Sequence, residues 1–104
     1  MNAAEPCFEA GTAAELALTN LLETHLYPAG DAIREVLLDR KTLGALKDLA
    51  LKLIPDKVPQ QLTDDLITPR NAAVHKPREE VSRDAAQKAI AKAAEVVQEA
   101  YPLD

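Results

Sequence analysis

The sequence predicts an all-α protein in a single domain. Nineteen alanines and fifteen leucines stand against three glycines, and small or unbranched side chains favour helix whereas glycine disfavours it. Apolar residues also recur at three- and four-residue intervals, the spacing that places them on one face of a helix. At 104 residues, the chain is long enough for one hydrophobic core and too short for two. We therefore take residues 1–104 as one helical domain.

The first helix is predicted to begin at Thr12, behind a flexible segment of residues 1–11. Thr12 and Glu15 match the capping box, in which each side chain satisfies a free backbone N–H at a helix start. The sequence from Pro28 to Gly30 then stops the helix after Leu26. The positions expected to face the core are Ala14, Ala17, Leu18, Leu21, Leu22, His25 and Leu26.

Two further helices are expected in the middle of the chain. Asp31 is a candidate cap for a short helix over residues 31–38. Thr42 is a candidate cap for the most clearly periodic helix, which Pro55 terminates. Its predicted apolar stripe consists of Leu43, Leu46, Leu49, Ala50, Leu53 and Ile54.

A fourth helical stretch is expected from Val58 towards Ala73, with Pro59 in its first turn. Pro69 interrupts it, because proline lacks the N–H that a helix interior uses and clashes with the preceding turn. Either the helix kinks at this point, or a new turn begins with Thr68 as its cap. Both outcomes place residues 70–75 on a helical turn.

The last helix is predicted from Ser82, a favourable N-cap, to about Ala100. Its inward positions are mostly small, which permits close approach of another helix. That helix belongs either to the same chain or to a second copy in a homodimer. The predicted inward positions are Ala86, Ala89, Ile90, Ala93, Val97 and Ala100.

Composition and charge narrow the function classes. One cysteine, Cys7, excludes an internal disulfide framework, and three aromatic residues leave too few rings for a base-stacking nucleic-acid platform. The net charge of −5 lies entirely within residues 1–31, whereas residues 70–92 hold six bases against three acids, a local excess that can meet phosphates. The sequence has neither a signal-peptide pattern nor a membrane-length apolar run. We expect a cytoplasmic protein with no membrane partner.

Arg70-Asn71-Ala72-Ala73-Val74-His75 is the candidate site, because unusual polar residues gather there on a predicted helix. Asn71 and His75 are four residues apart and share a face, with Arg70 beside them. The structural alternative is a helix end at which His75 caps carbonyls. In that case Arg70 pairs on the surface with Asp64, Asp65 or Glu79.

Two other reactive side chains are interpreted as structural. We expect His25 to be partly buried and hydrogen-bonded on the apolar stripe of the first helix. Cys7 has no basic neighbour to activate its thiol and is expected to lie in a frayed terminus.

The stretch from Arg70 to His75 resembles the Arg-x4-6-His signature of HEPN domains, including the polar residue after the arginine and the position before the last long helix. The resemblance covers residues 12–103 in helix order and size. It implies a four- to five-helix bundle that forms a homodimer and brings two copies of the motif into one cleft. In catalytic members of the family, that cleft is a metal-independent endoribonuclease, so neither a cofactor nor a metal is implied.

The resemblance also implies roles for three residues. His75 would be the general acid or base at the ribose 2′-OH or the leaving oxygen, and Arg70 would hold the scissile phosphate. Asn71 would orient the histidine or the phosphate. The toxin branch that pairs with an antitoxin continues the motif as His-x-Tyr, whereas this chain has Pro77 at that position.

Three functions from different classes follow. The first is a HEPN-like endoribonuclease, or an RNA-acting toxin or defence domain, that uses Arg70 and His75 at a dimer cleft. The second is a non-catalytic HEPN-like dimerisation or interaction module whose protein partner is an antitoxin or a regulatory subunit. The third is a small helical adaptor without a nucleic-acid partner, which the acidic first third of the chain would suit.

Overall fold

A computed structural model describes residues 4–39, 41–75 and 81–102, with the backbone alone for Ala4, Val74 and His75. Within these ranges every regular element is a helix or a helical turn, which confirms the predicted all-α class, and five α-helices form the bundle. The elements are α1 (Ala4–Leu26), the 3-10 turn η1 (Tyr27–Ala29), α2 (Asp31–Leu38), α3 (Leu43–Leu53), the 3-10 turn η2 (Pro55–Lys57), the π-helical turn η3 (Thr63–Ile67), α4 (Thr68–His75) and α5 (Arg83–Ala100).

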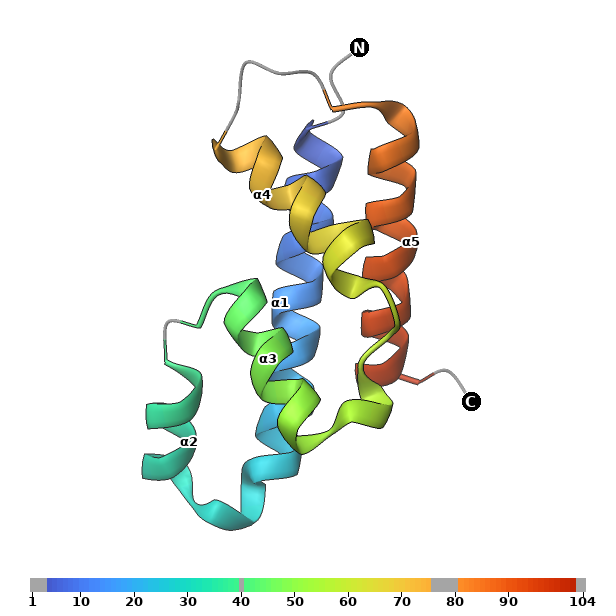
Figure 1. Cartoon of the computed structure of the whole chain (residues 1–104). Coiled ribbons are helices and arrows are strands. Elements are labelled where there is room, and N and C mark those ends of the chain that lie inside the picture. The colour runs from blue at the N-terminus through green and yellow to red at the C-terminus, as the bar shows by residue number, and fades with distance from the viewer. Residues whose placement is uncertain (1–3, 40, 76–80, 103–104) are drawn as a thin grey trace.

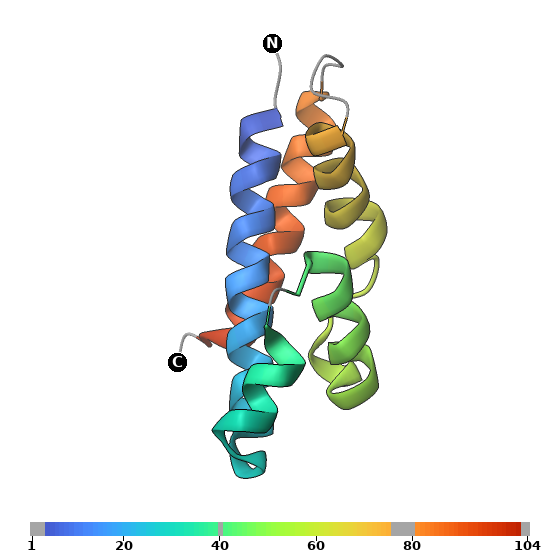
Figure 2. The ribbon, with the colours of Figure 1, turned by 90° about the vertical axis from the view of Figure 1, so that its left-hand side faces the viewer.

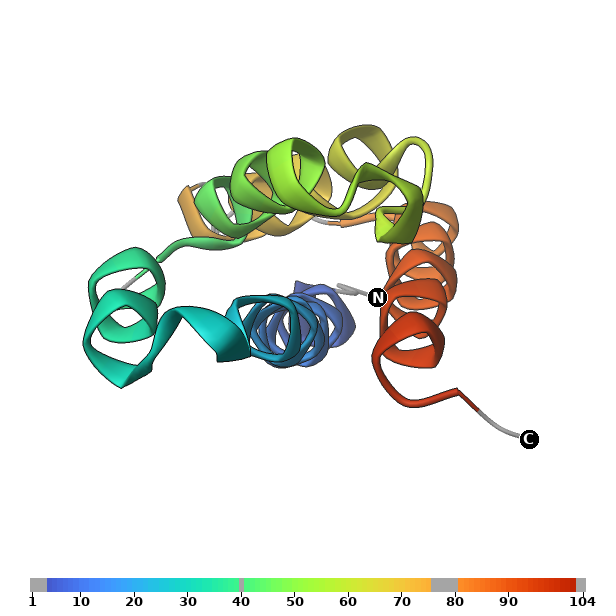
Figure 3. The ribbon, with the colours of Figure 1, turned by 90° about the horizontal axis from the view of Figure 1, so that it is seen from below.

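The long helix α1 is the centre of the bundle. It runs beside α5 in the same direction, and the chain goes up and down between them through the shorter elements (Figures 1 and 2). Seen from below, α1 lies between α2 and α5, with α3 and α4 covering one of its sides (Figure 3). The molecule measures 46 × 31 × 18 Å, so every helix lies close to the surface. The helix α1 contacts each of the other α-helices.

The first helix begins eight residues earlier than predicted. Residues 4–11, expected to be a flexible segment, form the first two turns of α1 and bury Cys7 and Ala10 in the core. Thr12 lies inside the helix, so the predicted capping box is wrong. Pro6 is tolerated because the N–H groups of a first turn have no helical acceptor. The predicted end of the helix at Leu26 is confirmed.

Small residues make the principal helix–helix contact, which lies between α1 and α5. Because this contact is within the chain, the alanine seam of α5 is explained without a second copy. The prediction for Ile90 is wrong, since its side chain is 49 % exposed, whereas Val96, which was not predicted, is fully buried. The buried alanines of the two helices are Ala10, Ala14, Ala17, Ala86, Ala89 and Ala93.

Leucines fill the rest of the core, where α3 and η3 meet α1. The predicted helix after Thr42 is confirmed, and the Thr42 hydroxyl accepts a hydrogen bond from the Ala45 N–H at 3.1 Å. Leu53, expected in the stripe, is exposed. The fully buried leucines are Leu18, Leu22, Leu43, Leu46 and Leu66.

The short helix α2 is confirmed, but its cap is not the predicted one. Gly30 occupies the N-cap position with φ +90°, a conformation that costs a glycine little. Asp31 is therefore the first helical residue, and its carboxylate pairs with Arg34 one turn later. None of the side chains of α2 is buried.

The predicted helix from Val58 begins later, at Leu62. Gln61 has φ +62° and ends the loop, and its carbonyl accepts a hydrogen bond from the Asp65 N–H. The chain then widens into η3, where the Thr68 N–H donates to the carbonyl of Thr63 five residues back, and continues directly into α4. Thr68 has helical dihedrals and is not a cap. The π-helical turn ends at Ile67, two residues before Pro69, whose ring and missing N–H disturb the α-helical ladder of the preceding turn.

The last helix is confirmed as predicted. The Ser82 hydroxyl caps α5 by accepting a hydrogen bond from the Ala85 N–H at 3.0 Å, and the helix ends at Ala100. The predicted loop before it lies largely in residues 76–80, outside the described ranges. In the described part of the chain, no helix has the length and hydropathy needed to cross a bilayer.

Candidate functional site

The side chain of Arg70 crosses from α4 onto α1 at Gly11. A Cβ atom added at Gly11 would lie 2.8 Å from Cγ, 3.2 Å from Nε and 3.4 Å from Cδ of Arg70. Carbon atoms in ordinary contact are about 3.5–4.0 Å apart, so a side chain at position 11 would occupy the space of the arginine. Gly11 therefore leaves the space in which the Arg70 side chain lies.

Two oxygen acceptors hold the guanidinium of Arg70. Nη2 donates to Oε1 of Glu15 on α1 at 3.3 Å, and Nη1 donates to Oδ1 of Asn71 at 3.4 Å. Both are longer than the usual N–H···O distance of about 2.9–3.0 Å. The side chains of Arg70 and Glu15 are 27 % and 32 % exposed. A guanidinium has five N–H donors, so the geometry leaves donors for a further anion.

The structure places the three predicted site residues on one helix, α4, and brings two of them into contact. Asn71 is exposed and hydrogen-bonded to Arg70. The backbone of His75 closes α4, four residues after Asn71 and on the same face by helical register. The side chain of His75 lies outside the described part of the chain. Its meeting with Arg70 and Asn71 stays a prediction.

Glu15 and Gly11 are the two residues of this site that sequence analysis missed. The alternative interpretation of Arg70 named Asp64, Asp65 or Glu79 as its partner, whereas the structure shows Glu15. Asp65 pairs with Lys92 at 3.8 Å, and Glu79 lies outside the described ranges. A glycine inside a helix costs about 1 kcal/mol relative to alanine. A glycine kept inside a helix despite that cost was the signal in the sequence that another group approaches the backbone closely at Gly11.

The basic excess predicted for residues 70–92 is largely paired where the structure describes it. The Lys92 ammonium lies 2.6 Å from Glu95 and 3.8 Å from Asp65, and Lys88 lies 3.6 Å from Asp84. These pairs reduce the positive field that an RNA backbone would meet along α5. Arg70 is likewise paired, with Glu15, so ion pairs lower the positive charge that this stretch offers to a phosphate.

The other two reactive side chains differ from their predictions. His25 is exposed at the end of α1 instead of partly buried. Cys7 is fully buried instead of frayed, and burial raises the pKa of its thiol above the ordinary value of 9.0. Among the residues described, no three His, Cys, Asp or Glu side chains are grouped to hold a metal ion.

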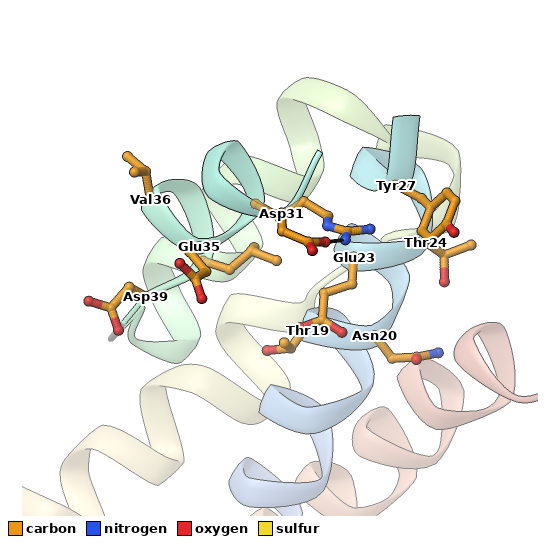
Figure 4. Close-up of a pocket in the computed structure, with 11 residues that line it drawn as sticks. Thr19, Asn20, Glu23, Thr24, Tyr27, Asp31, Glu35, Val36 and Asp39 are labelled. Carbon is orange, nitrogen blue, oxygen red and sulfur yellow. Dashed lines mark hydrogen bonds and ion pairs between the residues drawn. The ribbon is translucent and has the colours of Figure 1, made fainter. Parts of the chain in front are cut away.

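A second concave region, which the sequence did not predict, lies between the last turns of α1 and the helix α2. It is an open groove of about 1160 Å³. Carboxylates come from both walls, and Tyr27 lies at one end (Figure 4). The groove starts at Thr19, four residues beyond Glu15 on α1, and is separate from the Arg70 contact.

Comparisons with protein-family models, with curated proteins and with solved structures find no match to this chain.

Proposed function

We propose that this chain is a HEPN-like domain that acts on RNA through Arg70 and His75, as a metal-independent endoribonuclease. The observation that supports this proposal is the placement of Arg70. Its stem lies in the space left by Gly11, its guanidinium is oriented by Glu15 and Asn71, and part of it is exposed. A pre-oriented guanidinium with free donors is suited to a phosphate.

The reaction needs a base, an acid and a phosphate ligand. The ribose 2′ oxygen attacks phosphorus while the bond from phosphorus to the 5′ oxygen breaks, leaving a 2′,3′-cyclic phosphate and a 5′-hydroxyl. A base takes the 2′ proton, and an acid supplies a proton to the leaving oxygen. His75 is suited to one of these transfers because an ordinary imidazole titrates near neutrality. Arg70 offsets the charge that develops on the non-bridging oxygens.

A homodimer is part of the proposal, because two copies of the motif would supply two histidines to one cleft. The seam of α5 is used within the chain and is not available for this contact. The dimer would then use the face of α4 that carries Asn71.

One observation favours a second candidate, a non-catalytic interaction module. The Glu15 carboxylate already contacts Arg70, so a phosphate must compete with it. The net charge of −5 further opposes RNA binding. In this candidate the pair between Glu15 and Arg70 joins α4 to α1, and the motif has a structural role.

The test is incubation of the purified protein with mixed RNA in EDTA buffer. Wild type is compared with Arg70→Ala, His75→Ala and Arg83→Ala, the last being a matched control at an exposed arginine that begins α5. The proposal expects cleavage with cyclic-phosphate ends by wild type and Arg83→Ala only. All four proteins should have the same helicity and, by light scattering, the same oligomeric state. Absence of cleavage by all four proteins contradicts the proposal and favours the interaction module, in which the pair between Glu15 and Arg70 is structural. Absence of binding favours the adaptor without a nucleic-acid partner.

A further inference from the structure

The helix α2 presents an uncovered surface. It has eight residues, and none of them is buried. The side chains of Ile33 and Val36 are 53 % and 78 % exposed. A helix of two turns is marginal in water on its own, and most helices in proteins gain stability by burying an apolar face. An uncovered apolar side on so short a helix points to a surface that another segment covers.

The groove beside α2 is strongly acidic. Asp31 and Glu35 lie four residues apart on α2, Asp39 follows directly after the helix, and Glu23 contributes a carboxylate from α1 (Figure 4). Four residues correspond to a backbone rise of about 6 Å along a helix, so Asp31 and Glu35 lie about one turn apart. Arg34 is the one base among the lining residues. Four acids against one base give the groove a net charge of −3.

Arg34 is an example, within the chain itself, of a guanidinium bound in this groove. Its carbon Cζ lies 4.9 Å from the centroid of the Tyr27 ring, and its Nη2 pairs with the Asp31 carboxylate. An aromatic face and a carboxylate together form a favourable site for arginine. The carboxylates of Glu23, Glu35 and Asp39 have no ion-pair partner among the described residues, so they remain free for further cations.

We propose that the groove between α1 and α2 is the docking site for an amphipathic helical segment of a partner protein, rich in arginine and lysine. Bases repeated every four residues on one side of that helix would match Asp31, Glu35 and Asp39. Apolar residues beside those bases would cover Val36, which lines the groove and is 78 % exposed. The match uses the acidic-motif and helix-in-groove modes of recognition together.

The negative charge of the groove disfavours a second copy of the chain and RNA as occupants. A second copy docked by a twofold axis would face the same carboxylates across the interface, which is unfavourable. RNA would be repelled by the same side chains. A single metal ion is not the expected occupant, because the described residues contain no group of three His, Cys, Asp or Glu side chains that could hold one. This docking surface does not depend on Arg70 and stands whether or not the chain cleaves RNA.

The test uses two fluorescent helical peptides of equal composition and the whole chain. One peptide carries arginines at every fourth position beside leucines, and the other has the same residues in scrambled order. Fluorescence anisotropy at physiological salt is measured for wild type and for the charge-reduced pair Glu35→Gln with Asp39→Asn. The matched control is the pair Glu5→Gln with Glu9→Gln, which removes the same charge from an exposed part of α1.

The proposal expects saturable binding of the ordered peptide. Glu35→Gln with Asp39→Asn should weaken its affinity about tenfold or more, which corresponds to about 1.4 kcal/mol. Glu5→Gln with Glu9→Gln should change its affinity less than about twofold. Val36→Ala should also weaken it. Three results would overturn the proposal: no saturable binding, equal weakening by both pairs, or equal affinity for the scrambled peptide. Dimerisation of the protein that Glu35→Gln with Asp39→Asn abolishes would replace the partner with a second copy.

Discussion

The contact between Gly11 and Arg70 predicts opposite outcomes for the same substitution at two helical glycines. Gly44 lies in α3, and a Cβ atom added there meets nothing within 4 Å. Gly44→Ala should therefore raise the free energy of unfolding by about 0.5–1 kcal/mol through helix propensity alone. Gly11→Ala gains the same term, but the new Cβ lies 2.8 Å from Cγ of Arg70.

The opposing terms at Gly11 can be estimated from the structure. Overpacking a close contact costs about 1–3 kcal/mol, and it falls on Cγ, near the base of the arginine, where the side chain has little freedom to yield. Displacing Arg70 also loses its partly exposed pair with Glu15, which contributes about 0–1 kcal/mol. Relative to Gly44→Ala, the stability of Gly11→Ala should be lower by about 1–4 kcal/mol.

The assay is urea unfolding followed by far-UV circular dichroism, read as midpoints at a constant slope. Truncating the arginine provides the internal check. In an Arg70→Ala background Gly11→Ala should stabilise, as Gly44→Ala does, and the double-mutant cycle should give a coupling of at least about 1 kcal/mol. Equal stabilisation at both glycines in the wild-type background would refute the placement of Arg70 on α1, and with it the geometry of the candidate site.

Four further predictions concern the core, the cap of α5 and the buried thiol. Ala89→Leu should lower the free energy of unfolding, measured in urea, by about 1–3 kcal/mol, because Ala89 is fully buried between helices. Ala91 is exposed on the same helix, so Ala91→Leu should change that free energy by less than about 0.5 kcal/mol. Equal effects would contradict the packing of α5 on α1. Ser82→Ala should lower stability by about 1 kcal/mol through loss of the cap on α5, and an unchanged urea midpoint would contradict that cap. The Cys7 thiol should react with a disulfide reagent far more slowly in the folded than in the urea-unfolded chain, and equal rates would contradict its burial. Because the pKa of that thiol is raised in the folded state, the unfolded chain loses its proton first, and the free energy of unfolding should fall as the pH rises above about 9.

Local signals in the sequence were enough to predict most of the fold. The hydroxyls of Thr42 and Ser82 cap the helices that follow them, because capping depends on residues within one turn. The start of α1 was missed because Thr12 and Glu15 also match a local motif. The apolar spacing from Ala14 back through Ala10 to Cys7 was the stronger signal.

Long-range contacts explain what could not be predicted. Glu15 is 55 positions away from Arg70, and nothing within one turn of either residue indicates the other. The π-helical turn before Pro69 is a third solution beside the predicted kink and new turn, and it lies against α5, which is distant in sequence. Of the candidate site, the sequence therefore predicted residues and their helical register, and the structure added the partners that orient Arg70.

We propose that Arg70 is a phosphate ligand, and the Nε–Hε resonance of Arg70 tests this role most directly. A single-stranded DNA oligonucleotide carries the same phosphates as RNA but lacks the 2′-hydroxyl, so it reports binding without cleavage. Titration of nitrogen-15-labelled protein should shift the Arg70 resonance first and saturably, and added salt should reverse the shift. If Arg83 shifts while Arg70 stays fixed against Glu15, Arg70 is a structural residue and the proposed RNA site is wrong.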